Sequence, residues 1–161
     1  MSRNRQGPGS ATTVGTVPNN EHGRSSPVLC PSAQPHMDGA MAIGVVDYTG
    51  DAPQVAYLER PTAPTSELLA MARPLKPTEI FRFAAPCQAE ACSHWSEGKC
   101  KLATRVVQLI PVASTSLPRC HIRTQCRWYS QEGRVACERC PHIATQNESP
   151  SDVMREAATP K

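Results

Sequence analysis

Two short apolar stretches in the first half of the chain have the pattern of paired β-strands. Residues 42–48 (AIGVVDY) and 54–59 (QVAYLE) flank a turn-forming pentapeptide, TGDAP. In the second stretch every other residue, beginning with Val55 and Tyr57, falls on one face, as expected of a half-buried strand. We therefore predict a β-hairpin here, whose second strand ends at the prolines of Pro61–Pro64.

Helical periodicity follows the hairpin. Residues 66–73 (SELLAMAR) have a capping residue in Thr65 or Ser66 and stop before Pro74. The longest such pattern, KLATRVVQLI over residues 101–110, places apolar side chains at i, i+4, i+7 and i+8 and is followed by a proline. We predict one helix in each stretch.

Two weaker patterns lie on either side of the longer helix. Residues 80–83 (IFRF) alternate and predict a strand with Phe81 and Phe83 on one face. Further along, three apolar residues are spaced to share one face of a helix: Ile122, Cys126 and Tyr129. Gly133 is the residue at which we expect that helix to end.

The flanking segments are polar. Residues 1–39 hold five prolines and five glycines without apolar periodicity, so we expect a disordered N-terminal arm. Residues 146–161 have the composition of a mobile tail. Between them we predict one small α+β domain over 40–145. It divides into a hairpin and short-helix scaffold over 40–80 and a cysteine-rich module over 81–145.

The core of this predicted domain is thin. Only 4% of the 161 residues are aromatic, 16 are proline and eight are cysteine. A small core usually needs disulfides, a bound metal or a partner chain for stability. Seven of the eight cysteines fall within residues 87–140. We therefore expect a cysteine-rich α+β fold that is stapled by metal.

The compartment bears on what the cysteines do. Disulfides need an oxidising environment, and the N-terminal residues contain no apolar run of signal-peptide length. No window approaches the roughly 20 apolar residues of a membrane span. We therefore expect a cytoplasmic protein without a membrane partner, whose reduced cysteines hold a metal. Disulfides and free structural thiols are the alternatives.

The last four cysteines have the spacing C-x5-C-x10-C-x2-C, with proline directly after them: Cys120, Cys126, Cys137 and Cys140. Two cysteines two residues apart present both thiolates from one tight turn, a feature of zinc and iron–sulfur sites alike. A zinc ribbon would have two such turns, whereas this module has one. The Cys-Pro step matches the end of the bacterial ferredoxin run. We predict that these four bind an iron–sulfur cluster, with zinc as the alternative.

An earlier group adds three cysteines and a histidine to the candidate ligands: Cys87, Cys92, His94 and Cys100. Together they match a Cys3His metal site. Equally, the three thiolates could hold a cluster whose fourth corner is open or filled from elsewhere in the chain. Cys30 lies far from both groups in sequence. We expect it to be an incidental thiol, so that Cys30→Ser alters neither metal content nor folding.

Positive charge is concentrated in the cysteine-rich module. Residues 81–145 contain nine Lys or Arg and four acidic residues, a balance of +5, although the whole chain carries only +3. Three of the arginines recur at every fourth position: Arg119, Arg123 and Arg127. On one helix they would line one side, where they could offset thiolate charge or contact nucleic acid.

These observations favour a non-enzymatic role. The chain has no nucleotide-binding, hydrolase, metalloprotease or zinc-deaminase motif. We predict a small iron–sulfur protein, with a [4Fe–4S] cluster, that acts in electron transfer, redox sensing or as an accessory subunit beside a redox or other protein partner. The alternative is a zinc-binding module that recognises nucleic acid or a protein.

Overall fold

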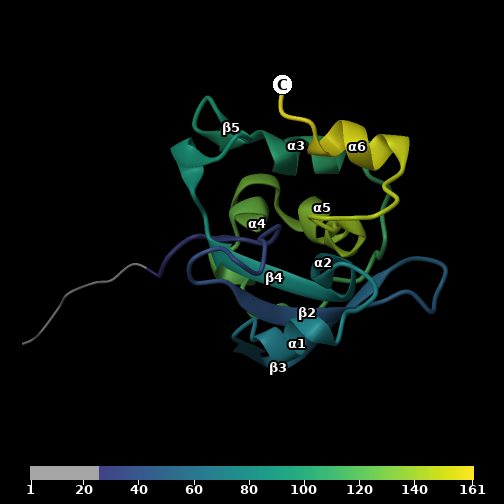
Figure 1. Cartoon of the computed structure of the whole chain (residues 1–161). Coiled ribbons are helices and arrows are strands. Elements are labelled where there is room, and N and C mark those ends of the chain that lie inside the picture. Colours follow the sequence, from purple (N-terminus) through teal and green to yellow (C-terminus); the bar gives the residue numbers. More distant parts are fainter. Residues whose placement is uncertain (1–25) are drawn as a thin grey trace, which may run out of the picture.

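An antiparallel four-stranded sheet runs through the centre of the protein in the computed structural model, which describes residues 26–161 (Figure 1). The strands lie in the order β1 (Leu29–Cys30), β4 (Phe81–Pro86), β2 (Met41–Asp47) and β3 (Gln54–Thr62). Helices cover both faces, so the architecture is mixed α+β as predicted. Strands β2 and β3 are the predicted hairpin, joined through the TGDAP turn.

The hairpin continues further than the sequence suggests. Strand β3 passes through Pro61 to Thr62, so the predicted break at that proline is wrong. It is the edge strand of the sheet, where a residue without an N–H group breaks no ladder hydrogen bond. Gly44 of β2 adjoins a register shift, and a Cβ there would lie 2.6 Å from the Cγ1 atom of Val55. Only glycine allows the two strands to approach so closely.

One face of the sheet carries the purely apolar core. Phe81 and Phe83 are both buried on it with their ring centroids 6.2 Å apart, which confirms that they share a face. The short helix α1 (Ser66–Ala70) packs over this side, and Thr65 caps it by accepting a hydrogen bond from the Leu68 N–H group. Helix α2 (Pro77–Ile80) leads directly into β4.

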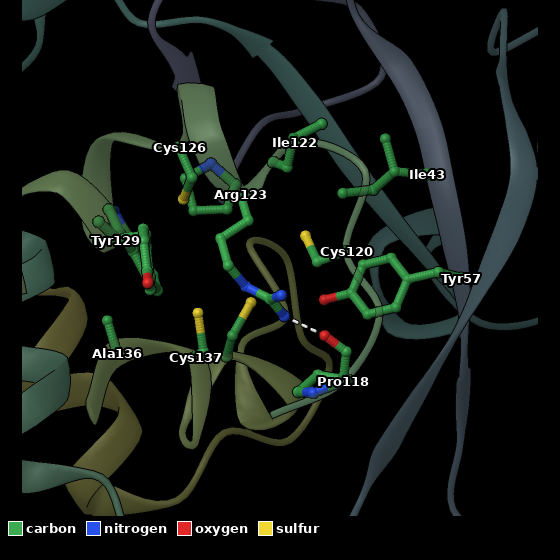
Figure 2. Close-up of a pocket in the computed structure, with 13 residues that line it drawn as sticks. Ile43, Tyr57, Pro118, Cys120, Ile122, Arg123, Cys126, Tyr129, Ala136 and Cys137 are labelled. Atoms are coloured by element: carbon green, nitrogen blue, oxygen red, sulfur yellow. Dashed lines mark hydrogen bonds between the residues drawn. The ribbon is translucent and has the colours of Figure 1, made fainter. Parts of the chain in front are cut away.

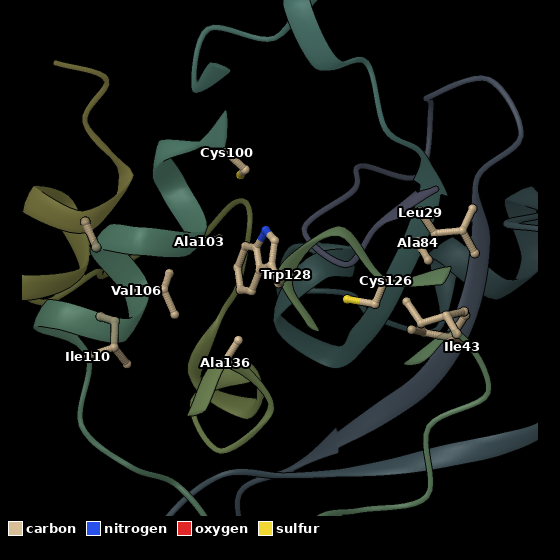
Figure 3. Packing of buried hydrophobic residues seen from close by; sticks show 12 residues of the cluster. Leu29, Ile43, Ala84, Cys100, Ala103, Val106, Ile110, Cys126, Trp128 and Ala136 are labelled. Carbon is tan, nitrogen blue, oxygen red and sulfur yellow. The ribbon is translucent and has the colours of Figure 1, made fainter. Parts of the chain in front are cut away.

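The opposite face is covered by the cysteine-rich half of the chain. Helices α4 (Arg127–Glu132) and α5 (Arg134–Cys137) lie next to the sheet, with α3 (Lys101–Leu109) and α6 (Asp152–Ala158) beyond them (Figure 1). The predicted helix over 101–110 is therefore confirmed. Trp128 of α4 is only 1% exposed and lies in the middle of this second core (Figure 3).

The predicted single helix that holds Ile122, Cys126 and Tyr129 is wrong. The chain forms a 3-10 turn, η2 (Arg123–Gln125), and then becomes extended at Cys126 before α4 begins. Because of this break, the side chains before and after Cys126 do not point along one face as they would on a continuous helix. Gly133 does end α4, because its N–H group bonds to the carbonyl oxygen of Tyr129 and its φ is +69°.

Both predicted flexible segments need correction. Residues 26–39 belong to the fold and supply β1, while residues 1–25 of the predicted arm lie outside the described part. Much of the predicted tail forms α6, which is capped by Ser151. The buried Arg105 of α3 fastens α6 by donating a 2.7 Å hydrogen bond from Nε to the Ala157 carbonyl oxygen.

The remaining elements are short and belong to the cysteine-rich half: η1 (Ala89–Ala91), β5 (Trp95–Ser96), β6 (Lys99–Cys100) and η3 (Cys140–His142). Strands β5 and β6 form a separate two-stranded hairpin. Among the helices between residues 26 and 161, none is long and apolar enough to cross a membrane.

Candidate metal centres

The four cysteines with the C-x5-C-x10-C-x2-C spacing line one cavity between the sheet and the helices. We call it the downstream site, defined by Cys120, Cys126, Cys137 and Cys140. Ile43 and Tyr57 of the sheet and Trp128 of α4 complete its walls. Figure 2 shows the labelled thiols approaching from different sides, with the Arg123 side chain between Cys120 and Cys137. The fold thus brings the whole predicted ligand set together.

Most of these cysteines lie where a short element begins or ends. The extended backbone of Cys126 separates η2 from α4, and Cys137 is the last residue of α5. Cys140 opens η3, where Pro141 occupies the first turn and so sacrifices no helical hydrogen bond. The tight C-x2-C pair therefore spans the turn from α5 to η3.

Burial favours the neutral form of three downstream thiols, those of Cys126, Cys137 and Cys140. It raises the pKa of Cys126 to about 12, and it also raises the pKa values of Cys137 and Cys140. Arg123 beside Cys137 and Arg82 beside Cys140 act in the opposite direction by favouring the thiolates. A bound cation or cluster would lower these pKa values further and leave the sulfur atoms deprotonated, because metal ligation requires deprotonated sulfur.

Several buried N–H groups around the cysteines have no acceptor among the residues described: the Nε atoms of Arg82, Arg123 and Arg127, and the Nε1 atom of Trp128. Arg123 and Trp128 line the downstream cavity, and Arg127 lines the cavity of the earlier cysteine group. A buried donor without a partner costs about 1–3 kcal/mol. Thiolate or sulfide acceptors in these cavities would fit donors of this kind.

The earlier cysteine group also has four members, because Cys30 joins it. The upstream site, defined by Cys30, Cys87, Cys92 and Cys100, lines a second cavity together with Trp95. Cys30 pairs with Ala85 in the β1–β4 ladder, and the Cys87 N–H group donates a 2.8 Å hydrogen bond to the Val28 carbonyl oxygen. Cys30 is thus far from the other cysteines in sequence but lies at their cavity, and its predicted incidental role stays a prediction.

The four upstream thiols influence one another electrostatically. Burial, with a smaller contribution from charge on Cys100, Cys87 and Cys92, raises the pKa of Cys30 to about 12. Burial also raises the pKa of Cys100. Arg127 supplies positive charge to this cavity, with its guanidinium carbon 4.9 Å from the centroid of the Trp95 ring.

His94 lies at the same cavity but already has a partner. Its Nδ1 atom is 2.9 Å from the Nη2 atom of Arg105. Since arginine can only donate, Nδ1 accepts the hydrogen bond and the imidazole is neutral. Burial and the charge of Arg105 both lower the pKa of His94. Ligation by His94 stays a prediction, and only its Nε2 atom remains for it.

The arginines do not form the predicted stripe. Arg123 lies in η2 and Arg127 at the start of α4, with extended Cys126 between them, so they face different cavities. Arg119 is exposed. Arg82, which the sequence analysis left among the unassigned charges, is buried on β4 and donates to the Pro141 carbonyl oxygen at 3.2 Å.

The sequence analysis missed Cys30, Arg82 and Tyr57 as parts of these sites. Only Cys30 carried a usable signal, because Cys30–Pro31 repeats the Cys-Pro step at Cys140. All eight cysteines are free thiols. Within residues 26–161, no three His, Cys, Asp or Glu side chains are placed to hold one metal ion together. The thiols of each set instead face a shared cavity.

Comparisons of the chain with protein-family models, with curated proteins and with solved structures gave no match.

Proposed function

We propose that this chain is a small iron–sulfur protein that transfers electrons, with a [4Fe–4S] cluster bound by Cys120, Cys126, Cys137 and Cys140. The observation that carries the proposal is the downstream site itself. Four cysteines, two of them from one tight turn, line one cavity, and the buried Nε–H group of Arg123 beside them has no acceptor in the described part of the chain.

The arrangement of the thiols supports a cluster. A [4Fe–4S] core has an iron at each of four corners, so its four thiolates are spread around it. A single zinc ion instead holds every sulfur about 2.3 Å from one point. The three labelled downstream thiols, those of Cys120, Cys126 and Cys137, approach the cavity from different sides (Figure 2). Zinc at the same cysteines remains the alternative.

The charges fit the same proposal. Four thiolates around a [4Fe–4S] core in its oxidised state leave a net charge of about −2. Arg82 and Arg123 bring two positive charges to the cavity from opposite elements, β4 and η2. Their N–H groups could donate to sulfur, which is one of the ways in which proteins set cluster potentials.

The apolar walls of the downstream cavity suit a bound cofactor whose only reaction is electron transfer. Ile43, Ile122 and Trp128 are buried around the thiols, which limits the access of water to the cavity. A cluster held by these cysteines would supply one-electron transfer, from a low-potential redox protein to an acceptor protein. No bond in this chain is formed or broken, and Tyr57, whose pKa burial raises, stays protonated.

Anaerobic purification tests this proposal. The protein should be brown, absorb broadly near roughly 400 nm, and contain iron and acid-labile sulfide in equal amounts. Cys140→Ser should lose downstream iron and its share of the absorbance. Val135→Ser, on the same helix as Cys137 but exposed, is the matched control and should keep both. Colourless protein with stoichiometric zinc would overturn the proposal.

A further inference from the structure

Strand β1 has only two residues, but its pairing determines where Cys30 lies. It pairs with the last residues of β4, Leu29 with Pro86 and Cys30 with Ala85. Cys87 follows β4 immediately and is tied back to Val28 by its N–H group. The chain thereby places Cys30 beside a cysteine that is 57 positions later in the sequence. Because this pairing is specific, an incidental role for Cys30 is a poor explanation of its position.

The other members of the upstream site arrive from different turns. Cys92 follows η1, and Cys100 ends β6. The side-chain amide of Gln131 in α4 fixes the backbone of Cys100, since Oε1 accepts from its N–H group at 2.8 Å and Nε2 donates to its carbonyl oxygen at 2.9 Å. The upstream site thus has a built frame as well as four thiols.

We propose that Cys30, Cys87, Cys92 and Cys100 bind a second [4Fe–4S] cluster, and that α4 couples it to the downstream cluster. The proposal rests on the proposed function, because it takes the downstream cluster as given. The chemistry of the cavity supports it, because Arg127 brings a positive charge and a buried Nε–H group without an acceptor among the described residues. A remote cysteine followed by proline that completes a cluster is also a ferredoxin device.

The two cavities share walls, which is the basis of the coupling. Cys30 lines the upstream cavity and Pro31 the downstream one. In α4 and the residue before it, Cys126 and Trp128 line the downstream cavity, whereas Arg127 lines the upstream one. A β-bridge between Leu29 and Cys126 holds these two walls together.

Trp128 is the side chain placed between the sites. Figure 3 shows its ring between Cys100 of the upstream site and Ala136 of the downstream wall, with the ring nitrogen on the Cys100 side. The coupled step is the transfer of one electron from one reduced cluster to the other, oxidised one. The first returns to the oxidised state as the second is reduced, and no proton or further reactant is needed.

The iron content of cysteine variants tests the second cluster. The wild-type chain should contain about eight iron atoms. Cys30→Ser should lose between one and four of them and keep the downstream cluster, whereas the exposed Val28→Ser on the same segment should lose none. Cys92→Ser, in the turn after η1, is a second variant in case Cys30→Ser does not fold.

The outcomes separate the two proposals. If the wild-type chain holds about four iron atoms and neither Cys30→Ser nor Cys92→Ser changes that number, the second cluster is refuted and the downstream cluster stands. If the wild-type chain holds no iron, both proposals fail together.

Electron paramagnetic resonance tests the coupling. Dithionite, a low-potential chemical reductant, should add one electron to each cluster. The spectrum of the reduced wild-type protein should then be broadened by interaction between two neighbouring spins. If it equals the sum of the spectra of Cys30→Ser and Cys140→Ser, the clusters are not coupled and this part of the proposal is wrong.

Discussion

At the scale of single residues, three buried or half-buried arginines lie beside the cysteine cavities. Arg82, Arg123 and Arg127 each reach a cysteine cavity with a guanidinium group, and each has a buried Nε–H group without an acceptor among residues 26–161. Negatively charged sulfur would satisfy these donors, and the donors would stabilise that charge. We therefore propose that these three arginines serve the proposed clusters, and contact with nucleic acid stays the alternative.

Arg123 offers the sharpest test at this scale. Removal of its charge should destabilise the reduced, more negative cluster more than the oxidised one. We expect Arg123→Met to lower the downstream reduction potential by about 60 mV, which is a tenfold change in a one-electron equilibrium. Arg123→Lys keeps the positive charge but loses the planar guanidinium group. Its downstream reduction potential should therefore lie between those of the wild type and Arg123→Met. Spectroelectrochemical titration measures all three.

The control for this experiment is Arg155→Met. Arg155 is an exposed residue of α6 that pairs with Asp152 at the surface, so solvent screening should leave the potential unchanged. An intact cluster with the wild-type potential in Arg123→Met would show that this arginine does not interact with the cluster.

At the scale of elements, the cysteine-rich half is built from pieces too short to be stable alone. Helices α4 and α5 have six and four residues, and isolated helices of that length are not stable in water. They are held by contacts with α3, by Gln131 against Cys100, and by the sheet beneath. Helix α6 closes this layer from outside through the buried Ala157 and its bond from Arg105.

Two adjacent alanines test the docking of α6. Ala157 is 3% exposed and faces α3, whereas Ala158 is exposed. Ala157→Lys places an unpaired charge in the interface next to Arg105 and should destabilise the protein by about 2 kcal/mol. Ala158→Lys should change stability by less than about 0.5 kcal/mol. Urea unfolding of the two variants measures the difference, and equal stabilities would mean that α6 is not docked in solution.

Local patterns in the sequence were enough to predict the elements in which packing and propensity agree. The hairpin, the capping of α1 by Thr65 and the amphipathic α3 are of this kind. The break at Cys126 could not be predicted this way, because apolar spacing alone suggests a continuous helix there. Helix α6 was missed because only one of its residues, Ala157, is buried, which leaves almost no amphipathic signal.

The candidate sites were predictable to a similar extent. All four downstream cysteines and three of the four upstream ones follow from spacing within a short segment. Cys30 reaches the upstream site only through the pairing of β1 with β4, and such long-range contacts leave little trace in one sequence. The same holds for Arg82 and Tyr57, which enter the downstream site from the sheet.

At the scale of the whole molecule, the sheet separates two different cores. The side of Phe81 and Phe83 is purely apolar, whereas the other side surrounds eight thiols with Trp128 near the centre. Without bound metal, the second side buries thiols whose pKa values are raised, such as those of Cys30 and Cys126, beside N–H donors that have no acceptor among residues 26–161. Because clusters would bind only the folded chain, their binding free energy contributes to folding. If the proposed clusters are bound, they would be both the functional groups and the staples of this half.

Native mass spectrometry of the anaerobically isolated full chain tests this account most directly, because it identifies what the eight cysteines hold. We expect a mass that exceeds that of the polypeptide by two increments, each of four iron and four sulfide. An increment of zinc alone, or a mass lowered by the paired hydrogens that disulfides lose, would contradict the account.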